Sequence, residues 1–337
     1  MKKAILHGPR DLRIEDVELD TSSLKPHDVW VETEITAFKI GTDRGNYAGA
    51  EQVPGAPGYP RFVGDSNLGT VRGVGSEVTR FRVGDRVVSR APHQSEYIAE
   101  ESQSMVKVPD GVDPEDGVWA HLYTLSSLCY RKAHFQPGEN VAVVGLGVLG
   151  LGAVALGSAF GARVVGIGNS ETRLEMAQRM GAHDVFLSDA TELPNKLDAF
   201  TGGAGVDLVI LTANPWSAYR TSVEVVRPGG RVSIVSLLGR GEPPLDFNPL
   251  AMEFFYLKGI SLIAVNGRAG YLYPGEEDRF EWDRACAYVL SLISDGRLEP
   301  KRLNTHRLSY SDMVEAYEMA YSREKSMLGV VFDWRDA

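Results

Sequence analysis

A glycine-rich turn between two apolar runs is the part of this sequence whose residue types and spacing most directly imply chemistry. Residues 140–144 are typical of a strand, a small-residue helix pattern follows the turn, and residues 163–167 are again strand-like. Gly145 permits a tight turn, Gly147 lets the backbone approach a pyrophosphate, and Gly150 lets the helix pack closely on the strand. The N-terminus of the helix adds free N–H groups and the positive end of its dipole. The whole unit therefore predicts a dinucleotide-binding site.

The end of the second strand indicates which dinucleotide is bound. Sites for NAD usually place Asp or Glu about 20 residues past the glycines, where the carboxylate holds the ribose 2′-hydroxyl. Here Gly168 occupies that position, and Asn169 and Ser170 can donate hydrogen bonds to a 2′-phosphate. Arg173 can supply positive charge, because guanidinium groups suit phosphate. Glu171 favours NAD(H), but the missing carboxylate at the strand end predicts NADP(H).

Composition and charge restrict the class of protein. The chain has 337 residues, of which 43% are hydrophobic and 24% charged, an ordinary balance for a globular protein of two domains. A net charge of −10 makes nucleic acid and anionic membrane poor partners, and no apolar run is long enough to predict a membrane span. The first residues do not resemble an apolar signal segment, and Cys129 and Cys286 make no disulfide framework. We expect a cytoplasmic protein that acts on a small molecule.

The residue pattern changes twice along the chain. Residues 1–120 show short apolar alternations broken by Gly and Pro, which predicts a compact, mostly β domain. Residues 121–265 alternate strand-like and helix-like segments, which predicts a doubly wound parallel sheet. From residue 266 onward come two helix patterns, at 282–296 and 309–322, and a terminal strand pattern. The predicted fold class is therefore α/β, with a β-rich domain in addition to the dinucleotide-binding sheet.

Several motifs show that the chain resembles the medium-chain dehydrogenase/reductase superfamily over nearly all its length. Besides the glycine turn, they are Gly41-Thr42-Asp43, the pattern GxVxxVGSxVxxFxVGDRVV at Gly69–Val88, Arg227-Pro-Gly-Gly230, and THRLSYSDMVEAYE at 305–318. The resemblance implies a GroES-like catalytic domain made from residues 1–120 and 266–337, and a Rossmann domain at 121–265. It also implies hydride transfer in a cleft, and homodimers that pair the last Rossmann strand, about 259–266, edge to edge.

The chain departs from the zinc-binding members of this superfamily at each ligand position. Their cysteine before Gly-Thr/Ser-Asp is Ile40 here, residues 64–66 read Gly-Asp-Ser in place of Gly-His-Glu, and the third ligand position is Ala120. The lobe with four cysteines that holds a structural zinc has no counterpart in this sequence. Because zinc needs three or four converging N, S or O ligands, we expect no metal site. The segments GDSNLGTV (64–71) and APH (91–93) resemble a zinc-lacking branch that includes the bacteriochlorophyllide hydroxyethyl dehydrogenases.

Without zinc, another group has to polarise a carbonyl oxygen or pass a proton. Thr42 matches the family's proton-relay hydroxyl, and Asp43 matches a carboxylate behind it or a turn residue that bonds backbone. His93 and His121 are the histidine candidates, because an unperturbed imidazole titrates near neutral pH. A makeshift metal site of Asp65 with either histidine stays open. Three cations near the motif could hold an anionic substrate group: Lys39, Arg44 and Arg61.

The predicted cofactor contacts extend beyond the glycine turn. Thr124 and the backbone near Leu237 and Val265 would meet the nicotinamide carboxamide, whereas Thr212 and Asn214 would lie near the ribose. The full set of predicted cofactor residues is Thr124, Gly145, Leu146, Gly147, Val148, Leu149, Gly150, Gly168, Asn169, Ser170, Arg173, Thr212, Asn214, Leu237 and Val265.

Three functions are open on this reasoning. The first is a zinc-independent, NADP(H)-dependent oxidoreductase that interconverts a secondary alcohol and a ketone on a small or medium organic molecule. The second is an NADPH-dependent reductase of an activated C=C or C=N bond, which has no need of a relay hydroxyl. The third is a non-catalytic NADPH-binding protein. The Gly-Thr-Asp motif at 41–43 favours the first.

Overall fold

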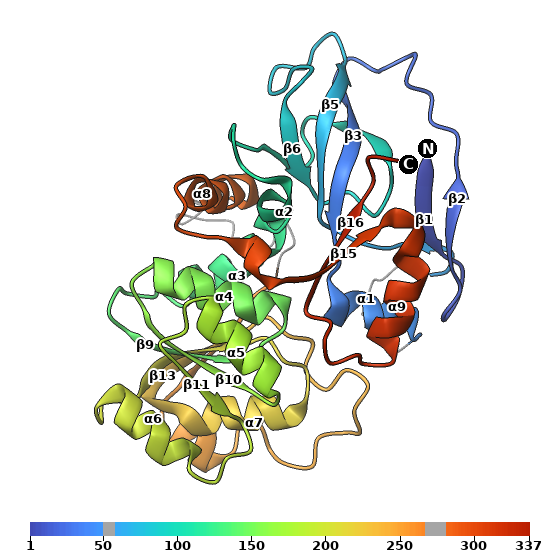
Figure 1. The fold of residues 1–337 in the computed structure, drawn as a ribbon. Coiled ribbons are helices and arrows are strands. Elements are labelled where there is room, and N and C mark those ends of the chain that lie inside the picture. Colours follow the sequence, from blue (N-terminus) through green and yellow to red (C-terminus); the bar gives the residue numbers. More distant parts are fainter. Residues whose placement is uncertain (50–57, 267–280) are drawn as a thin grey trace. The chain divides into compact units, whose positions relative to one another are not determined.

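The structure, a computed structural model, describes residues 1–49, 58–266 and 281–337 (Figure 1). Its chain divides into two compact units. Unit 1 comprises Met1–His121 and Tyr273–Ala337, and unit 2 comprises Leu122–Leu272. None of the described helices is long and apolar enough to cross a membrane.

Unit 1 is built on two β-sheets. In the larger sheet the order is β15 (Asn304–Ser309), β16 (Gly329–Asp333), β3 (Asp28–Ala37), β5 (Asn67–Val74), β6 (Arg86–Ser89) and β8 (Met105–Lys107), and β7 (Glu96–Glu100) also pairs with β3. In the smaller sheet β1 (Lys2–Leu6) lies between β2 (Leu12–Asp16) and β4 (Arg61–Phe62). Antiparallel pairing of Phe332 with Thr36 joins the two ends of the chain. The β-rich part of the predicted fold class is therefore confirmed.

Among the described residues, the α-helices that accompany these sheets are α1 (Ile40–Tyr47), α2 (Pro114–Gly117), α8 (Trp282–Ser294) and α9 (Met313–Tyr321). The two helices α1 and α9 pack together through an aromatic core. Phe38 stacks on Tyr317 with ring centroids 4.4 Å apart, and Tyr47 meets the edge of Tyr317 at 5.4 Å. These rings are fully buried, so they hold the segment before α1 in a fixed place.

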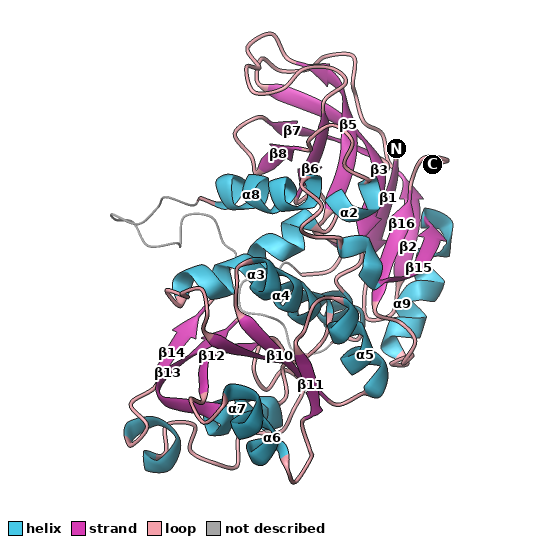
Figure 2. Cartoon of the chain, turned by 60° about the vertical axis from the view of Figure 1, so that its left-hand side comes forward, coloured by secondary structure: helices cyan, strands magenta, loops and turns pink. Residues whose placement is uncertain are grey.

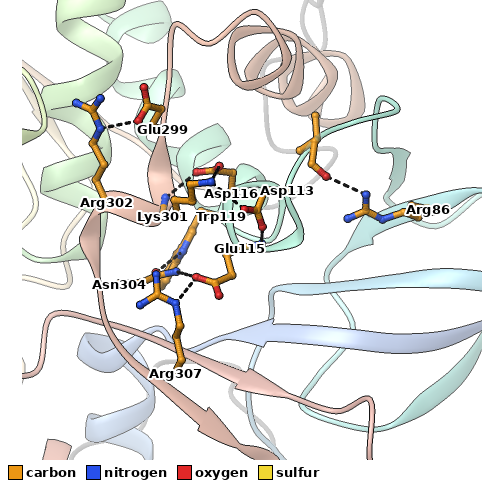
Figure 3. A network of polar contacts seen from close by, with 11 residues as sticks. Arg86, Asp113, Glu115, Asp116, Trp119, Glu299, Lys301, Arg302, Asn304 and Arg307 are labelled. Carbon is orange, nitrogen blue, oxygen red and sulfur yellow. Dashed lines mark hydrogen bonds and ion pairs between the residues drawn. The ribbon is translucent and has the colours of Figure 1, made fainter.

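A polar network joins the two chain segments of unit 1 near α2 (Figure 3). The backbone N–H of Lys301, in the short helix η3 (Pro300–Leu303), donates to Asp116 at 2.8 Å, and its ammonium contacts Asp113 at 2.8 Å. The indole N–H of Trp119 donates to Asn304 at 2.9 Å. Because Trp119 and Asp116 are buried, these bonds satisfy groups that water cannot reach.

Unit 2 is a six-stranded parallel sheet with helices on both faces (Figure 2). The strand order is β11 (Asp184–Leu187), β10 (Arg163–Gly168), β9 (Asn140–Val144), β12 (Val206–Leu211), β13 (Val226–Ile234) and β14 (Ser261–Ala264). On one face lie α4 (Val148–Ala159) and α5 (Glu171–Arg179), and on the other α6 (Leu193–Thr201) and α7 (Trp216–Val225). This is the Rossmann order, so the predicted doubly wound sheet is confirmed.

Residues 227–230, which we expected to form a turn before a strand, lie within β13, where the pairing between β12 and β13 is interrupted. Val206 pairs with Val226, but Leu208 already pairs with Arg231. Residues 227–230 therefore stand opposite a single residue of β12, and Gly229 adopts a positive φ of 70°. The expected turn is present as a bulge, after which the strand continues into the buried centre of the sheet.

Candidate active site

The glycine turn of unit 2 has the geometry that its sequence predicts. Gly145, at the end of β9, has a φ of 98°, a conformation that favours glycine. Its N–H donates to Ile167 O at 3.0 Å, and its carbonyl accepts from the Thr212 hydroxyl at 2.7 Å. A Cβ at this position would lie 2.6 Å from the Cβ of Ala213. The turn is therefore held by both neighbouring strands, and a side chain at Gly145 would not fit.

The other two glycines have different roles in the turn. A Cβ on Gly150 would lie 1.9 Å from the carbonyl oxygen of Gly145, so only glycine lets α4 approach the turn this closely. A Cβ on Gly147 would meet only Arg173 Nη1, at an ordinary 3.8 Å. Gly147 is the N-cap of α4, and its carbonyl oxygen accepts the N–H of Leu151 at 2.8 Å. The N–H groups of residues 148–150 are thus available at the helix N-terminus for an anion.

The residues predicted to recognise the 2′-position gather at the end of β10. Gly168 is buried, Asn169 is exposed, and Ser170 is the N-cap of α5 without using its side chain as a cap. Arg173 reaches back to the turn, where its Nη1 donates to Leu146 O at 3.1 Å. Burial lowers the pKa of Arg173, but a guanidinium stays charged at any physiological pH. The structure therefore brings a cation and two polar side chains together where a carboxylate would favour NAD.

The remaining predicted cofactor residues in unit 2 follow the carboxyl ends of three more strands. Thr212 and Asn214 come after β12, and Asn214 Oδ1 accepts the N–H of Leu237 at 3.1 Å. Leu237, which follows β13, is 43% exposed. Val265 follows β14 and donates its N–H to Ile234 O at 2.8 Å. Thr124 is fully buried in α3 (Ala120–Lys132). One edge of the sheet therefore carries most of the predicted set, as expected for ligands of open parallel sheets.

Lys39 and Asp65 form an ion pair in unit 1. Lys39 immediately precedes α1, and Asp65 lies between β4 and β5. The second carboxylate oxygen of Asp65 is buried without a partner among the described residues. Burial acts to raise the pKa of Asp65, but the positive charge of Lys39, with His121 and Arg90, outweighs it and lowers that pKa below its ordinary value. Asp65 is therefore an anion held by Lys39.

Asp43 lies beside this pair in α1 and is almost fully buried. Burial, and then the negative charge of Asp65, raise the pKa of Asp43 to about 7, against the opposing charge of Lys39. Its Oδ2 has no hydrogen-bond partner in the described structure. Thr42, the predicted relay hydroxyl, is half-buried on the same helix, and its backbone N–H donates to Lys39 O at 3.0 Å. The Gly-Thr-Asp motif therefore places a carboxyl group that can carry a proton near neutral pH.

His93 is a fully buried side chain of unit 1. Its Nδ1 lies 2.7 Å from the hydroxyl of Thr36, which also accepts the indole N–H of Trp334 at 2.9 Å. Gly64, with a φ of 85°, leaves room for the ring, because a Cβ there would lie 2.6 Å from it. Burial lowers the pKa of His93 to about 3, although Asp65 opposes the shift. The imidazole is therefore neutral at pH 7, in contrast to the expected titration near neutral pH.

His121 is also neutral at pH 7. Burial lowers its pKa to about 3, Asp65 opposes the shift, and the charges of Arg90 and Lys39 add to it. The ring lies tilted by 45° against Trp282, with ring centroids 4.8 Å apart, and the indole N–H of Trp282 donates to Nδ1 at 3.3 Å. Because Nδ1 is an acceptor, the proton of the neutral ring resides on Nε2. His121 therefore acts as a neutral donor and does not titrate between pH 5 and 8.

We call six side chains of unit 1 the polar cluster: Lys39, Asp43, Asp65, His93, His121 and Tyr317. The sequence reasoning named Lys39 and Asp65 separately and missed their pairing, the contact of His121 with Trp282, and Tyr317. An acidic residue at position 65, where the family has a histidine, together with the cation at Lys39, is a signal that could have predicted the ion pair. Arg61, the third predicted anion-binding cation, instead donates to Asn46 O at 3.0 Å.

The three positions that depart from the family's zinc ligands have other roles here. Ile40 packs against the aromatic core of unit 1, and the hydroxyl of Ser66 donates to Val118 O at 2.6 Å. Asp65 is paired with Lys39, and Ala120 has no ligand atom. Across residues 1–49, 58–266 and 281–337, no three His, Cys, Asp or Glu side chains converge as a metal site requires. These residues do not fit a zinc ion.

Comparison with known proteins agrees with this architecture. Residues 25–132 match the alcohol dehydrogenase GroES-like domain, and residues 148–276 match the zinc-binding dehydrogenase family. Sorbitol dehydrogenase of Bacillus subtilis is 24% identical, over 98% of this chain and 96% of that protein. The structure resembles galactitol-1-phosphate dehydrogenase from Escherichia coli (TM-score 0.83, 18% identity, 99% and 100% of the two chains). It also resembles a Sinorhizobium meliloti dehydrogenase bound to NADP (TM-score 0.78, 20% identity, 98% of each chain).

The two matched domains and the full-length relatives together support the medium-chain dehydrogenase/reductase superfamily as the family of this chain. The relatives include a sorbitol dehydrogenase and an L-threonine 3-dehydrogenase. Dehydrogenases of this fold bind nicotinamide dinucleotides, in one structure NADP and in another NADH.

Proposed function

We propose that this protein is a zinc-independent, NADP(H)-dependent oxidoreductase that interconverts a secondary alcohol and a ketone on a small or medium organic molecule. The observation that carries the proposal is the end of β10, where Arg173 lies against the glycine turn and the last strand residue is Gly168 instead of Asp or Glu. A bound nicotinamide supplies the hydride for reduction or accepts it in oxidation. The chain has to orient the substrate and stabilise the charge on its oxygen.

The residues of unit 2 fit an NADP(H) molecule in a definite order. The N–H groups of residues 148–150 would hold the pyrophosphate at the N-terminus of α4. Ser170 and Arg173 would hold the 2′-phosphate by hydrogen bonds and charge. Thr212 and Asn214 would contact the ribose, and the backbone at Leu237 and Val265, with Thr124, the carboxamide.

Zinc independence is supported by what occupies the family's ligand positions. An apolar contact at Ile40, a hydrogen bond at Ser66 and an ion pair at Asp65 are stable arrangements that a metal would have to break. We expect elemental analysis of the purified protein to find less than a tenth of a zinc per chain. One zinc per chain would contradict the proposal.

NADPH is expected to bind at least about tenfold more tightly than NADH, and Arg173→Ala should narrow this ratio to below about threefold. The reason is the loss of a charged hydrogen bond to phosphate, which contributes about one to two powers of ten in affinity. Fluorescence titration with both nucleotides measures the ratio. Arg179→Ala, at the other end of α5, is the matched control and should leave the ratio unchanged. Tighter binding of NADH by the unaltered protein would show that the end of β10 does not read the 2′-phosphate.

We also propose a homodimer that forms through the edge strand β14. Within the described sheet β14 pairs with β13 alone, and its outer backbone groups are therefore open to another strand. Ser261 and Ala264 are exposed on it. Light scattering after size-exclusion chromatography should give twice the mass of the chain, and Ser261→Lys/Ala264→Lys should give the monomer, since paired lysines repel. An unaltered mass in the double variant would place the interface elsewhere.

A further inference from the structure

The ion pair of Lys39 and Asp65 leaves hydrogen-bonding capacity on both partners. The Lys39 ammonium has three N–H donors, and Asp65 is the acceptor that the described residues provide for it. The side chain of Lys39 is 19% exposed, so a small molecule can reach it. Two N–H groups of Lys39 are therefore left for a bound ligand.

Three more buried atoms of the polar cluster have no partner among the described residues: Asp43 Oδ2, His93 Nε2 and the Tyr317 hydroxyl. They belong to residues packed beside the ion pair. Gly64, next to Asp65, adjoins the His93 ring, Phe38, next to Lys39, stacks on Tyr317 at 4.4 Å, and the Asp43 N–H donates to Lys39 O at 3.0 Å. Buried polar atoms without partners are rare in folded proteins and usually mark the place of a water molecule or a ligand. The cluster is therefore suited to receive polar atoms from outside the chain.

His121 adds a second donor to this cluster. Its Nδ1 is occupied by the indole N–H of Trp282, which leaves the Nε2–H to be donated. The Ser66 hydroxyl, next to Asp65 in the chain, donates to Val118 O at 2.6 Å and so ties the segment before His121 to the ion pair, whose charges act on the ring. A charged donor on Lys39 and a neutral donor on His121 are both complementary to an oxygen atom that becomes negative.

We propose that Lys39 is a catalytic residue whose ammonium group, together with the Nε2–H of His121, holds the carbonyl oxygen of the substrate. This inference rests on the proposed function and deepens it. When hydride adds to the carbonyl carbon, the π electrons of the C=O bond become a lone pair on oxygen, and the ammonium stabilises that charge. The oxygen then takes a proton from water to give the alcohol. Asp65 is a positioning residue, because it fixes the Lys39 ammonium and balances its charge.

The test compares Lys39→Met and Lys39→Ala with the unaltered protein. The substrates are cyclohexanone, acetoin and dihydroxyacetone, with NADPH as the reductant. We expect kcat for the best ketone to fall about 100-fold to 1,000-fold, as for other oxyanion donors, while the Kd for NADPH changes less than about twofold. In Lys39→Ala, added ethylammonium should restore part of the rate in proportion to its concentration. Lys39→Arg should retain more activity than Lys39→Met, since it keeps the charge but changes the geometry.

Two variants separate this role from a structural one. Lys39→Met leaves the buried carboxylate of Asp65 unpaired and could unfold unit 1, so Lys39→Met/Asp65→Asn removes both charges together. It should melt near the temperature of the unaltered protein, bind NADPH normally and remain inactive. Lys301→Met removes another lysine that is paired with an aspartate of unit 1, Asp113 at 2.8 Å, and should keep full activity.

The outcomes distinguish the inference from the function on which it rests. If the unaltered protein reduces a ketone and Lys39→Met is within threefold of it, the role of Lys39 is overturned and the proposed function stands. If the unaltered protein binds NADPH but reduces none of the ketones, the proposed function fails and the role of Lys39 fails with it. Loss of activity with ammonium rescue supports both.

Discussion

Gly150→Ala is expected to weaken NADPH binding by at least about 100-fold and to lower the melting temperature. The added methyl carbon would lie 1.9 Å from the carbonyl oxygen of Gly145. The backbone fixes the positions of both atoms, so neither can rotate away. Gly145 is fixed by Ile167 and Thr212, so α4 has to move away from the turn. Its N-terminal N–H groups would then no longer point at the pyrophosphate. Fluorescence titration and thermal melting measure the two effects.

Gly147→Ala is the matched control, because its methyl group meets nothing closer than 3.8 Å in the protein. We expect an unchanged melting temperature and an NADPH affinity reduced by about tenfold or more, since the methyl group would occupy the space that the pyrophosphate needs. The pair of variants therefore separates the packing of the helix from the binding of the nucleotide. An unchanged affinity in Gly147→Ala would show that the pyrophosphate does not approach this turn.

The second large effect is a loss of stability on acidification between pH 6.5 and pH 5, which Asp43→Asn should make steeper. The folded protein keeps His93 and His121 neutral down to about pH 3, whereas the unfolded chain protonates them near pH 6.5. Asp43 acts in the opposite sense, since the folded protein protonates it below about pH 7 and the unfolded chain only near pH 3.8. In this window the unfolded state therefore binds two additional protons on the histidines and one fewer on Asp43, a net of one.

A net of one proton lowers the free energy of unfolding by about 1.4 kcal/mol for each pH unit of acidification. Asp43→Asn removes the opposing group, so the slope should approach twice that value. The variant should also be more stable than the unaltered protein at pH 8, by on the order of 3 kcal/mol, and the difference should vanish below pH 4. Urea unfolding at a series of pH values measures both quantities.

Asp336→Asn, an exposed aspartate near the C-terminus, is the control for a change of net charge and should leave the slope unaltered. Equal slopes in Asp43→Asn and the unaltered protein would contradict a protonated Asp43. A flat profile in both would contradict the neutral, buried state of the two histidines. The charges that face these groups are those of Lys39, Asp65 and Arg90, and none of them is changed by the substitution.

Local chemistry allowed much of the fold to be predicted from the sequence. Gly145 has to adopt a positive φ, and at Gly150 a carbonyl oxygen occupies the space of a side chain. Both positions therefore require glycine, and the sequence motif shows this without any tertiary information. The central strands of unit 2 are apolar over most of their length because both faces of a parallel sheet are covered by helices. The same reasoning predicts a nucleotide site at residues 140–168 and places the discrimination between the two cofactors at the end of β10.

The state of the catalytic candidates was decided by tertiary structure alone. Whether His93 and His121 titrate near neutral pH depends on burial, and the sequence contains no local signal of it. The pairing of Lys39 with Asp65 joins residues 26 positions apart, which lie beside each other only because the β-rich unit closes around them. The physical reason is that backbone conformation is set by neighbours in sequence, whereas charge, solvation and hydrogen-bond partners are set by neighbours in space.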